Sequence, residues 1–221
     1  MSKRKPSRSN RIPADRMTLI FVGLLLVPFI CGFGYKYWLD KQVDKIKKAG
    51  IIYIDKENMV LELQDYQGRV IMKTGIACGK NYGNKQGKGD MRTPEGLFHI
   101  SDIQDASGWD HDFNDGNGKI AGAYGPWFLR LETPGHSGIG IHGTHDPNSI
   151  GTRATEGCIR LKNADIEKLK DLVYIGMPVA IVPSAKDIAE TAKVVAETKE
   201  EKKEMTETKV PLDSHNANGG K

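Results

Sequence analysis

The sequence predicts a mainly β fold with one or two short helices, preceded by a single N-terminal transmembrane helix. Two observations predict the β fold: 25 glycines in 221 residues, and short runs of Ile, Val and Leu that turn residues separate. A third observation predicts the membrane helix, because no charged residue occurs from Met17 to Tyr35. About 20 apolar residues in a helix cross the hydrocarbon core of a bilayer.

The first 49 residues are predicted to anchor the chain. Residues 1–16 form a short basic tail, which favours a cytoplasmic N-terminus. Residues 17–38 form the span, and residues 39–49 form a polar stalk. A cleaved signal peptide is the alternative, but no small-x-small cleavage site follows the apolar run. These features predict a single-pass protein of the cell membrane whose folded domain lies on the extracytoplasmic side.

The charge distribution argues against nucleic-acid binding. The net charge of the chain is +4, but residues 1–49 alone carry 11 Lys and Arg against 3 Asp and Glu. Residues 50–184, the predicted folded domain, carry 14 against 17. A nucleic-acid-binding domain needs its basic surface on the domain itself. The basic excess instead lies beside the apolar segment, so no nucleic-acid partner is expected.

The predicted elements of the folded domain follow the apolar runs. Asn163 is expected to cap a helix whose apolar face repeats at helical spacing. Asp110–Gly118 is expected to be a mobile loop or lid over a cleft, since Ala121 stands where a calcium loop requires Glu. Residues 185–221 are predicted to be a charged tail, in part helical and mostly without fixed structure. The expected strands are Ile51–Ile54, Met59–Leu63, Arg69–Ala77, Leu97–Ile100, Phe128–Leu131, Ile139–His142 and Val179–Val182.

Three cysteines are too few for a disulfide scaffold. Cys31 lies within the apolar segment and is expected to act as a small apolar residue. Cys78 ends a predicted strand and is expected in the core. Cys158 is therefore the cysteine whose surroundings indicate chemistry.

A histidine and a cysteine form the densest cluster of reactive residues. His142 ends a predicted strand, and Cys158 follows sixteen residues later. A thiol needs a nearby base to become a nucleophile near neutral pH, so Cys158 is the candidate nucleophile and His142 its base. Gly157 would let the backbone approach closely, and the Cys158 amide would stabilise an oxyanion. Arg160 would hold a carboxylate. On spacing alone, two ordinary residues remain the alternative.

A zinc site is the other reading of these side chains. His142, His145, Asp146 and Cys158 are all metal-ligand types. Structural zinc sites usually show two closely spaced pairs of Cys or His, and this stretch has one such pair. No metal is therefore expected.

The cluster lies within a longer resemblance to L,D-transpeptidases of the YkuD type. The active-site signature of that family is similar to His142-Gly143-Thr144 followed by Gly157-Cys158-Ile159-Arg160-Leu161. The stretches Thr93–Phe98, Gly125–Trp127, Asn163–Leu169 and Gly176–Val182 also resemble family segments, in the family's order, across about residues 50–183.

The resemblance implies a β-rich L,D-transpeptidase catalytic fold over residues 50–184 and a peptidoglycan substrate, with no cofactor. It implies that Cys158 forms a thioester with the third residue of a tetrapeptide stem and releases D-Ala. An amine of another stem then accepts the acyl group in a 3→3 crosslink. Gly157, Arg160, Thr144 and Glu156 are expected on the substrate or oxyanion side. Two alternatives stay open, an L,D-carboxypeptidase and a non-catalytic peptidoglycan-binding module; the oligomeric state also stays open.

One position departs from the family pattern. The family usually has histidine before the Gly-Cys pair, where this chain has Glu156. A carboxylate that faced Cys158 would raise the pKa of the thiol. Alternatively, Glu156 would bind the incoming amine or His142. The substitution bears on rate and acceptor preference rather than on reaction class.

Overall fold

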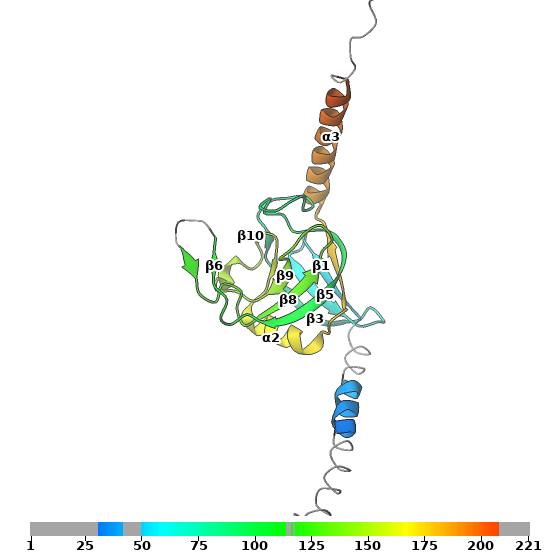
Figure 1. The fold of residues 1–221 in the computed structure, drawn as a ribbon, viewed down its shortest axis with the longest axis vertical. Coiled ribbons are helices and arrows are strands. Elements are labelled where there is room, and N and C mark those ends of the chain that lie inside the picture. Colours follow the sequence, from blue (N-terminus) through cyan, green and yellow to red (C-terminus); the bar gives the residue numbers. More distant parts are fainter. Residues whose placement is uncertain (1–30, 42–49, 114–115, 117, 208–221) are drawn as a thin grey trace, which may run out of the picture. The chain divides into compact units, whose positions relative to one another are not determined.

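The computed structural model describes residues 31–41, 50–113, 116 and 118–207 (Figure 1). The chain divides into two units, Met1–Ile46 and Lys47–Lys221. In the first unit, residues 31–41 are helical. The basic tail, most of the predicted span and residues 42–49 of the stalk lie outside the described residues. Within the described residues, no helix combines the length and the apolar character needed to cross a membrane.

An eight-stranded sheet organises the second unit (Figure 1). Its strand order is β11-β9-β8-β5-β12-β1-β2-β3. Neighbouring strands pair antiparallel, except for the parallel pairs β1–β12 and β9–β11. The strands are β1 (Ile51–Asp55), β2 (Val60–Gln64), β3 (Val70–Gly75), β5 (Gly96–Asp105), β8 (Trp127–Glu132), β9 (Gly140–His142), β11 (Ile159–Arg160) and β12 (Pro178–Val182).

Smaller elements surround the sheet. β4 (Cys78–Gly79) pairs with β10 (Arg153–Thr155) in parallel, and the 3-10 turn η1 spans Pro147–Ser149. β6 (His111–Asp112) and β7 (Lys119–Ile120) form an antiparallel hairpin. β6 lies within Asp110–Gly118, the stretch predicted as a mobile loop, and β7 begins directly after it.

Alternation of buried residues explains the sheet. In β1 and β2 every second side chain is buried, which is the period of a half-buried strand. Ile52, Ile54, Leu61 and Leu63 are fully buried and join one hydrophobic cluster with Cys78. The core position expected for Cys78 is therefore confirmed.

The helix α2 (Asn163–Leu172) packs beside β8 and β9 through Ile166 and Leu169. Its predicted cap is wrong by one residue. Lys162 is the N-cap and makes no side-chain capping bond, whereas Asn163 is the first helical residue. The Asn163 Oδ1 instead accepts a hydrogen bond from the Thr144 N–H at 2.7 Å. The helix thereby holds the loop that follows β9.

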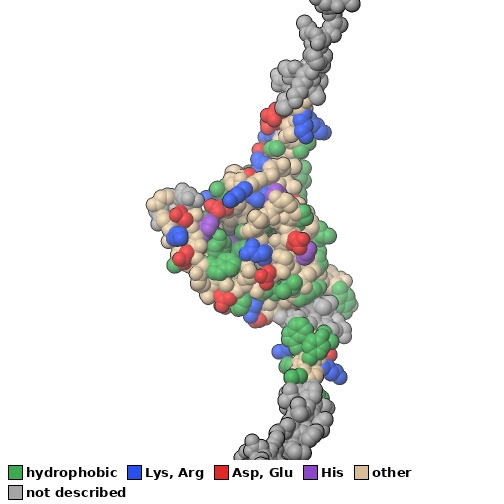
Figure 2. Space-filling view, in the orientation of Figure 1, with side chains coloured by type: hydrophobic (Ala, Val, Ile, Leu, Met, Phe, Trp, Pro, Cys, Tyr) green, Lys and Arg blue, Asp and Glu red, His purple; other side chains and the backbone are tan. Residues whose placement is uncertain are grey.

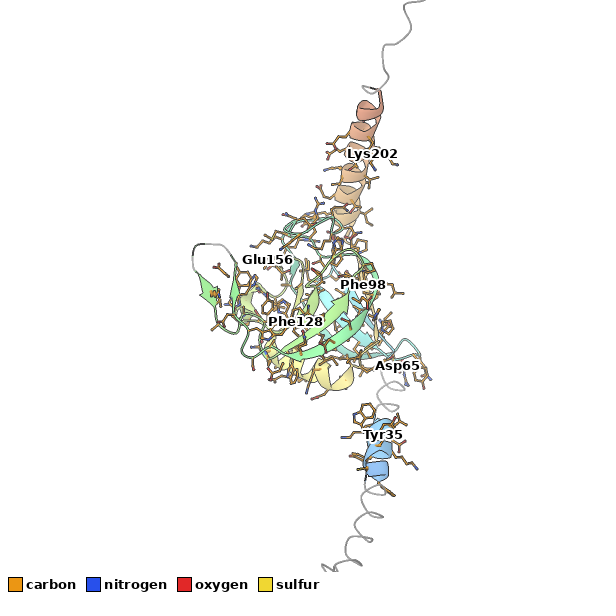
Figure 3. The ribbon with its side chains drawn as sticks, in the orientation of Figure 1. Tyr35, Asp65, Phe98, Phe128, Glu156 and Lys202 are labelled. Carbon is orange, nitrogen blue, oxygen red and sulfur yellow. The ribbon has the colours of Figure 1, made fainter. Side chains whose placement is uncertain are left out.

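The charged C-terminal segment differs from its prediction. α3 spans Ala185–Glu207, well beyond the one or two short helices expected (Figure 3). The Asp187 Oδ2 accepts from the Ser184 N–H at 2.9 Å, and Ser184 Oγ accepts from the Asp187 N–H at 3.1 Å. This reciprocal pair satisfies two backbone donors at a helix start. The Ser-x-x-Asp spacing was the local signal for this helix. On the face shown in Figure 2, Lys and Arg side chains are interspersed with acidic ones.

Candidate active site

Parallel pairing of β9 with β11 brings the two halves of the predicted site together. Ile159 lies opposite Ile141, and Arg160 lies opposite His142. Partners across a ladder point to the same face, and so do residues two apart along a strand. Cys158, which precedes β11, therefore shares a face with Arg160 and His142. The three side chains line one small cavity of about 30 Å³.

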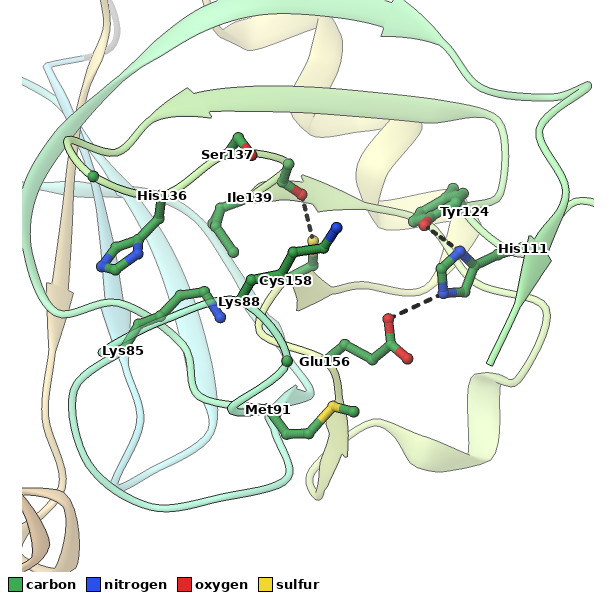
Figure 4. Close-up of a pocket in the computed structure, with 13 residues that line it drawn as sticks. Lys85, Lys88, Met91, His111, Tyr124, His136, Ser137, Ile139, Glu156 and Cys158 are labelled. Atoms are coloured by element: carbon green, nitrogen blue, oxygen red, sulfur yellow. Dashed lines mark hydrogen bonds and ion pairs between the residues drawn. The ribbon is translucent and has the colours of Figure 1, made fainter. Parts of the chain in front are cut away.

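The Cys158 thiol also borders a larger cavity of about 470 Å³ (Figure 4). Its Sγ donates to the Gly138 carbonyl at 3.3 Å. The pKa of Cys158 is raised to about 11, chiefly by burial and also by the Glu156 carboxylate. A hydrogen bond from the Gly140 N–H acts in the opposite direction and lowers this pKa. Cys158 therefore rests as a neutral thiol. It is partly exposed, so a substrate that enters the larger cavity reaches it.

His142 is buried, with 3% of its surface exposed. Its Nδ1 lies 2.6 Å from the Gly143 carbonyl oxygen. A carbonyl only accepts, so Nδ1 carries the hydrogen and Nε2 keeps a free lone pair. Burial lowers the pKa of His142 to about 3, and the positive charge of Arg160 lowers it further. The imidazole is therefore neutral and able to accept a proton.

The ring of Phe128 fixes the plane of His142. The two rings stack with centroids 5.6 Å apart and planes 4° apart, because Phe128 and His142 are partners across β8 and β9. A Cβ at Gly140 would collide with the Phe128 ring. Glycine at position 140 is thus required for the ring that orients the base.

Gly157 gives the backbone before Cys158 its shape. Its φ is +132°, a conformation that L side chains rarely adopt. A Cβ there would lie 2.6 Å from the Arg92 carbonyl oxygen. The close backbone approach expected of Gly157 is confirmed. Thr155 Oγ1, two residues earlier, accepts a hydrogen bond from the Gly157 N–H at 3.1 Å and so stabilises the turn.

Arg160 and Thr144 make hydrogen bonds to the segment that follows His142. The Arg160 Nη1 donates to Ser149 Oγ at 2.9 Å, and the buried Arg160 Nε has no hydrogen-bond partner in the described part of the chain. Thr144 Oγ1 accepts from the Asp146 N–H at 2.8 Å. Arg160 lines the small cavity, whereas the hydrogen bonds of Thr144 hold the loop after β9. A substrate role for either residue stays a prediction.

Glu156 pairs with a residue that the sequence analysis missed. Its Oε2 lies 3.0 Å from Nε2 of His111, in β6. The His111 Nδ1 in turn lies 3.0 Å from the hydroxyl of Tyr124 (Figure 4). Neither His111 nor Tyr124 lies in a recognisable motif. The only sequence signal was the exchange of histidine for Glu156, which leaves a carboxylate in need of a partner.

Two lysines also border the larger cavity. Lys85 is buried, and its Nζ lies 2.7 Å from Asp90 Oδ1. The exposed Lys88 lies along the same wall as Lys85 (Figure 4). Because Asp90 balances the charge of Lys85, Lys88 supplies the net positive charge on that side of the cavity.

The zinc alternative has no support in the geometry. His145 Nδ1 lies 3.3 Å from the Ala123 carbonyl, and its ring packs against Phe113. Within the described residues, no group of three or more His, Cys, Asp or Glu side chains is placed to hold a metal ion.

Comparison with protein families gives one matching family model, that of the L,D-transpeptidase catalytic domain YkuD, over residues 49–181. A protein of Bacillus licheniformis named L,D-transpeptidase YkuD is 35% identical over 104 residues, which are 47% of this chain and 53% of that protein. One of Bacillus subtilis named L,D-transpeptidase YqjB is 28% identical over 113 residues, 50% of this chain and 64% of that protein. The chain thus spans about half to two thirds of the curated relatives it matches.

Solved structures are also similar to part of the chain. The catalytic domain of the Enterococcus faecium L,D-transpeptidase is 22% identical, with a TM-score of 0.46, over 62% of this chain and 98% of that one. The helical cell shape determining protein Pgp2 from Campylobacter jejuni is 25% identical, with a TM-score of 0.46, over 69% of this chain and 56% of that one.

Proposed function

We propose that this chain, which belongs to the family of L,D-transpeptidase catalytic domains, is a cysteine acyltransferase that crosslinks peptidoglycan stem peptides. The observation that carries the proposal is the position of Cys158 and His142 on one cavity. A neutral thiol and a neutral imidazole beside each other are the reactants of general-base-assisted thiol attack.

In the first half-reaction, Cys158 Sγ attacks the carbonyl carbon of the third stem residue. His142 Nε2 takes the thiol proton and passes it to the amine of the departing D-Ala, which leaves a thioester on Cys158. Sγ first turns away from the Gly138 carbonyl. The tautomer fixed by Gly143 supports this role, since it keeps the lone pair on Nε2.

The developing oxyanion needs hydrogen-bond donors. We assign this role to the Cys158 backbone N–H, since Gly157 gives the turn before the nucleophile its unusual conformation. The thioester is then resolved by the side-chain amine of another stem. The product is a 3→3 crosslink, and the free thiol is regenerated.

The test uses the purified full chain and a disaccharide-tetrapeptide, with products followed by mass spectrometry. The expected product is a dimer that lacks one D-Ala, absent with Cys158→Ala and retained with the matched control Cys78→Ala. A tripeptide without a dimer would make the chain an L,D-carboxypeptidase. If the folded wild type gave no product, the acyltransferase proposal would be overturned in favour of a binding module.

We further propose that the chain acts outside the cytoplasm as a single-pass membrane protein. The uncharged run from Met17 to Tyr35 and the basic residues before it support this placement. Protease added to intact spheroplasts should degrade the catalytic domain. Protection from the protease, or recovery of the chain in the soluble fraction, would contradict the placement.

A further inference from the structure

We propose that Glu156, His111 and Tyr124 form a second acid–base relay, which takes a proton from the incoming amine when the thioester is resolved. The inference rests on the proposed function and adds residues to it. The three side chains come from separate segments: the turn before β11, the β6–β7 hairpin and the loop before β8.

The hydrogen bonds give the relay a direction. The Glu156 carboxylate accepts, so His111 Nε2, at 3.0 Å, carries a hydrogen. In the neutral imidazole, Nδ1 is then an acceptor, and it lies 3.0 Å from the Tyr124 hydroxyl. Burial, Cys158 and Glu156 raise the pKa of Tyr124 to about 12. The phenol therefore stays protonated and donates a hydrogen bond to His111 Nδ1. The order is therefore phenol, imidazole, carboxylate (Figure 4).

The relay meets Cys158 where the two cavities join. Tyr124, His111, Glu156 and Cys158 line both the 470 Å³ cavity and the 30 Å³ cavity. The Tyr124 ring also packs edge-on against His142, with centroids 4.9 Å apart. A group bound at the thioester therefore has the Tyr124 hydroxyl beside it.

The relay and His142 differ in how accessible they are to an incoming substrate. His142 is 3% exposed and borders only the smaller of these two cavities. The side chains of His111 and Glu156 are 27% and 33% exposed and border the larger one. An acceptor stem that enters the larger cavity thus contacts a wall that includes Glu156 and His111 but not His142. The carboxylate attracts an ammonium group, which is the charged form of a diamino acid side chain at neutral pH.

The proton transfers balance. The acceptor enters as an ammonium ion and becomes an amide, so it loses two protons. The first goes to the Tyr124 oxygen as Tyr124 gives its own proton to His111 Nδ1, and Glu156 stabilises the imidazolium. The free amine attacks the thioester carbon, the C–S bond breaks, and the Cys158 thiolate takes the second proton. His111 finally returns its proton to solvent through Tyr124.

The experiment measures the two half-reactions separately. The full chain is mixed with disaccharide-tetrapeptide, and the acyl-enzyme is quantified by rapid quench and mass spectrometry. Its decay is then followed with a stem tripeptide as amine acceptor. Tyr124→Phe, His111→Gln and Glu156→Gln should slow this decay about tenfold or more, and slow acyl-enzyme formation by about threefold at most.

Two further measurements distinguish a proton relay from side chains that only hold the β6–β7 hairpin in place. Charged and titratable groups that border the cavities with His111 are Glu156, Tyr124, Cys158, His136, His142, Arg160, Lys85 and Lys88. With the relay removed, decay should depend on amine that is already deprotonated, so its pH profile should move to higher pH. In the double variant Tyr124→Phe/His111→Gln, the acyl-enzyme should decay no more slowly than in the slower single variant, because both residues act in the same proton relay.

His145→Gln is the matched control, since it changes a nearby histidine that contacts the hairpin residue Phe113. Decay within about twofold of wild type is expected for it. Equal slowing of formation and decay, or decay that the three substitutions leave unchanged, would overturn the relay alone. Absence of an acyl-enzyme in the wild type would overturn the proposed function together with the relay.

Discussion

Two regions of the folded unit bury titratable side chains: the cavity around Cys158 and an ionic cluster at the start of α3. In the ionic cluster, the side chains of Lys56 and Asp187 are both fully buried, with Lys56 Nζ 3.2 Å from Asp187 Oδ1. Glu95 lies 2.6 Å from the same lysine, and Arg153 Nη2 lies 2.6 Å from Asp187 Oδ2. At the cavity, His142 is buried and Cys158 partly buried, and neither forms an ion pair with another described residue.

The two regions show that partners, rather than burial, decide the charge state. Burial alone would raise the pKa of Asp187, but hydrogen bonds from Ser184 and Gly83 and the charge of Lys56 lower it to about 2. At the cavity, the same desolvation meets weaker opposition and leaves both Cys158 and His142 neutral. The ionic cluster therefore stays charged, whereas the cavity holds neutral groups that can exchange a proton.

The largest expected effect is loss of all turnover in Cys158→Ala, because this variant lacks the nucleophile. The melting temperature should stay within a few degrees of wild type, since the thiol's hydrogen bonds, with the Gly138 carbonyl and the Gly140 N–H, are weak. Product analysis and thermal unfolding measure the two properties. Residual Cys158-independent turnover would contradict the assignment of the nucleophile.

His142→Gln should lower the rate of acyl-enzyme formation by about 10²- to 10⁴-fold, the usual contribution of a general base. Glutamine can retain a donor toward the Gly143 carbonyl but offers no basic nitrogen to the thiol. Rapid-quench mass spectrometry measures the rate. A loss of tenfold or less would assign the base to another group.

Asp187→Asn should act on stability instead of activity. Removing one partner of a buried ion pair costs about 3–5 kcal/mol. Because the pKa of Asp187 is lowered in the folded state, its stabilisation is complete above the unfolded pKa near 3.8 and is lost as the pH falls through about 2. The difference in the free energy of unfolding between Asp187→Asn and wild type should therefore become smaller below about pH 4. Urea unfolding as a function of pH measures it.

The control for that variant is Asp171→Asn. Asp171 pairs with Lys170 at 2.8 Å, but its side chain is 72% exposed. Exposed pairs contribute about 0–1 kcal/mol. Equal losses from the buried and exposed aspartates would remove the basis of the comparison between the two regions.

The last prediction concerns the resting thiol. With the pKa of Cys158 raised to about 11, only the small thiolate fraction reacts with iodoacetamide. Its alkylation rate should rise about tenfold per pH unit from pH 6 to pH 9. Intact-mass measurements follow the reaction. A plateau below pH 8 would indicate a thiolate–imidazolium pair in place of the two neutral groups.

The strands could be predicted because their signal is local. Alternation in β1 and β2 and the helical spacing in α2 repeat within a few residues, and the structure confirms these elements. Errors occurred where the deciding contact was distant. Asn163 was expected to cap its own helix but binds the backbone of Thr144. The start of α3 is fixed partly by hydrogen bonds that the Asp187 carboxylate accepts from the Gly83 N–H and from Arg153 Nη2.

The β-rich domain could be predicted from residue type and short spacing. The candidate pair Cys158 and His142 and the exchange of histidine for Glu156 were predicted from the resemblance to the family's motif. Only the tertiary structure decided that Glu156 faces His111, because that contact joins residues 45 positions apart. It also decided the charge states, since desolvation and the number of partners around a side chain are set by how distant segments pack.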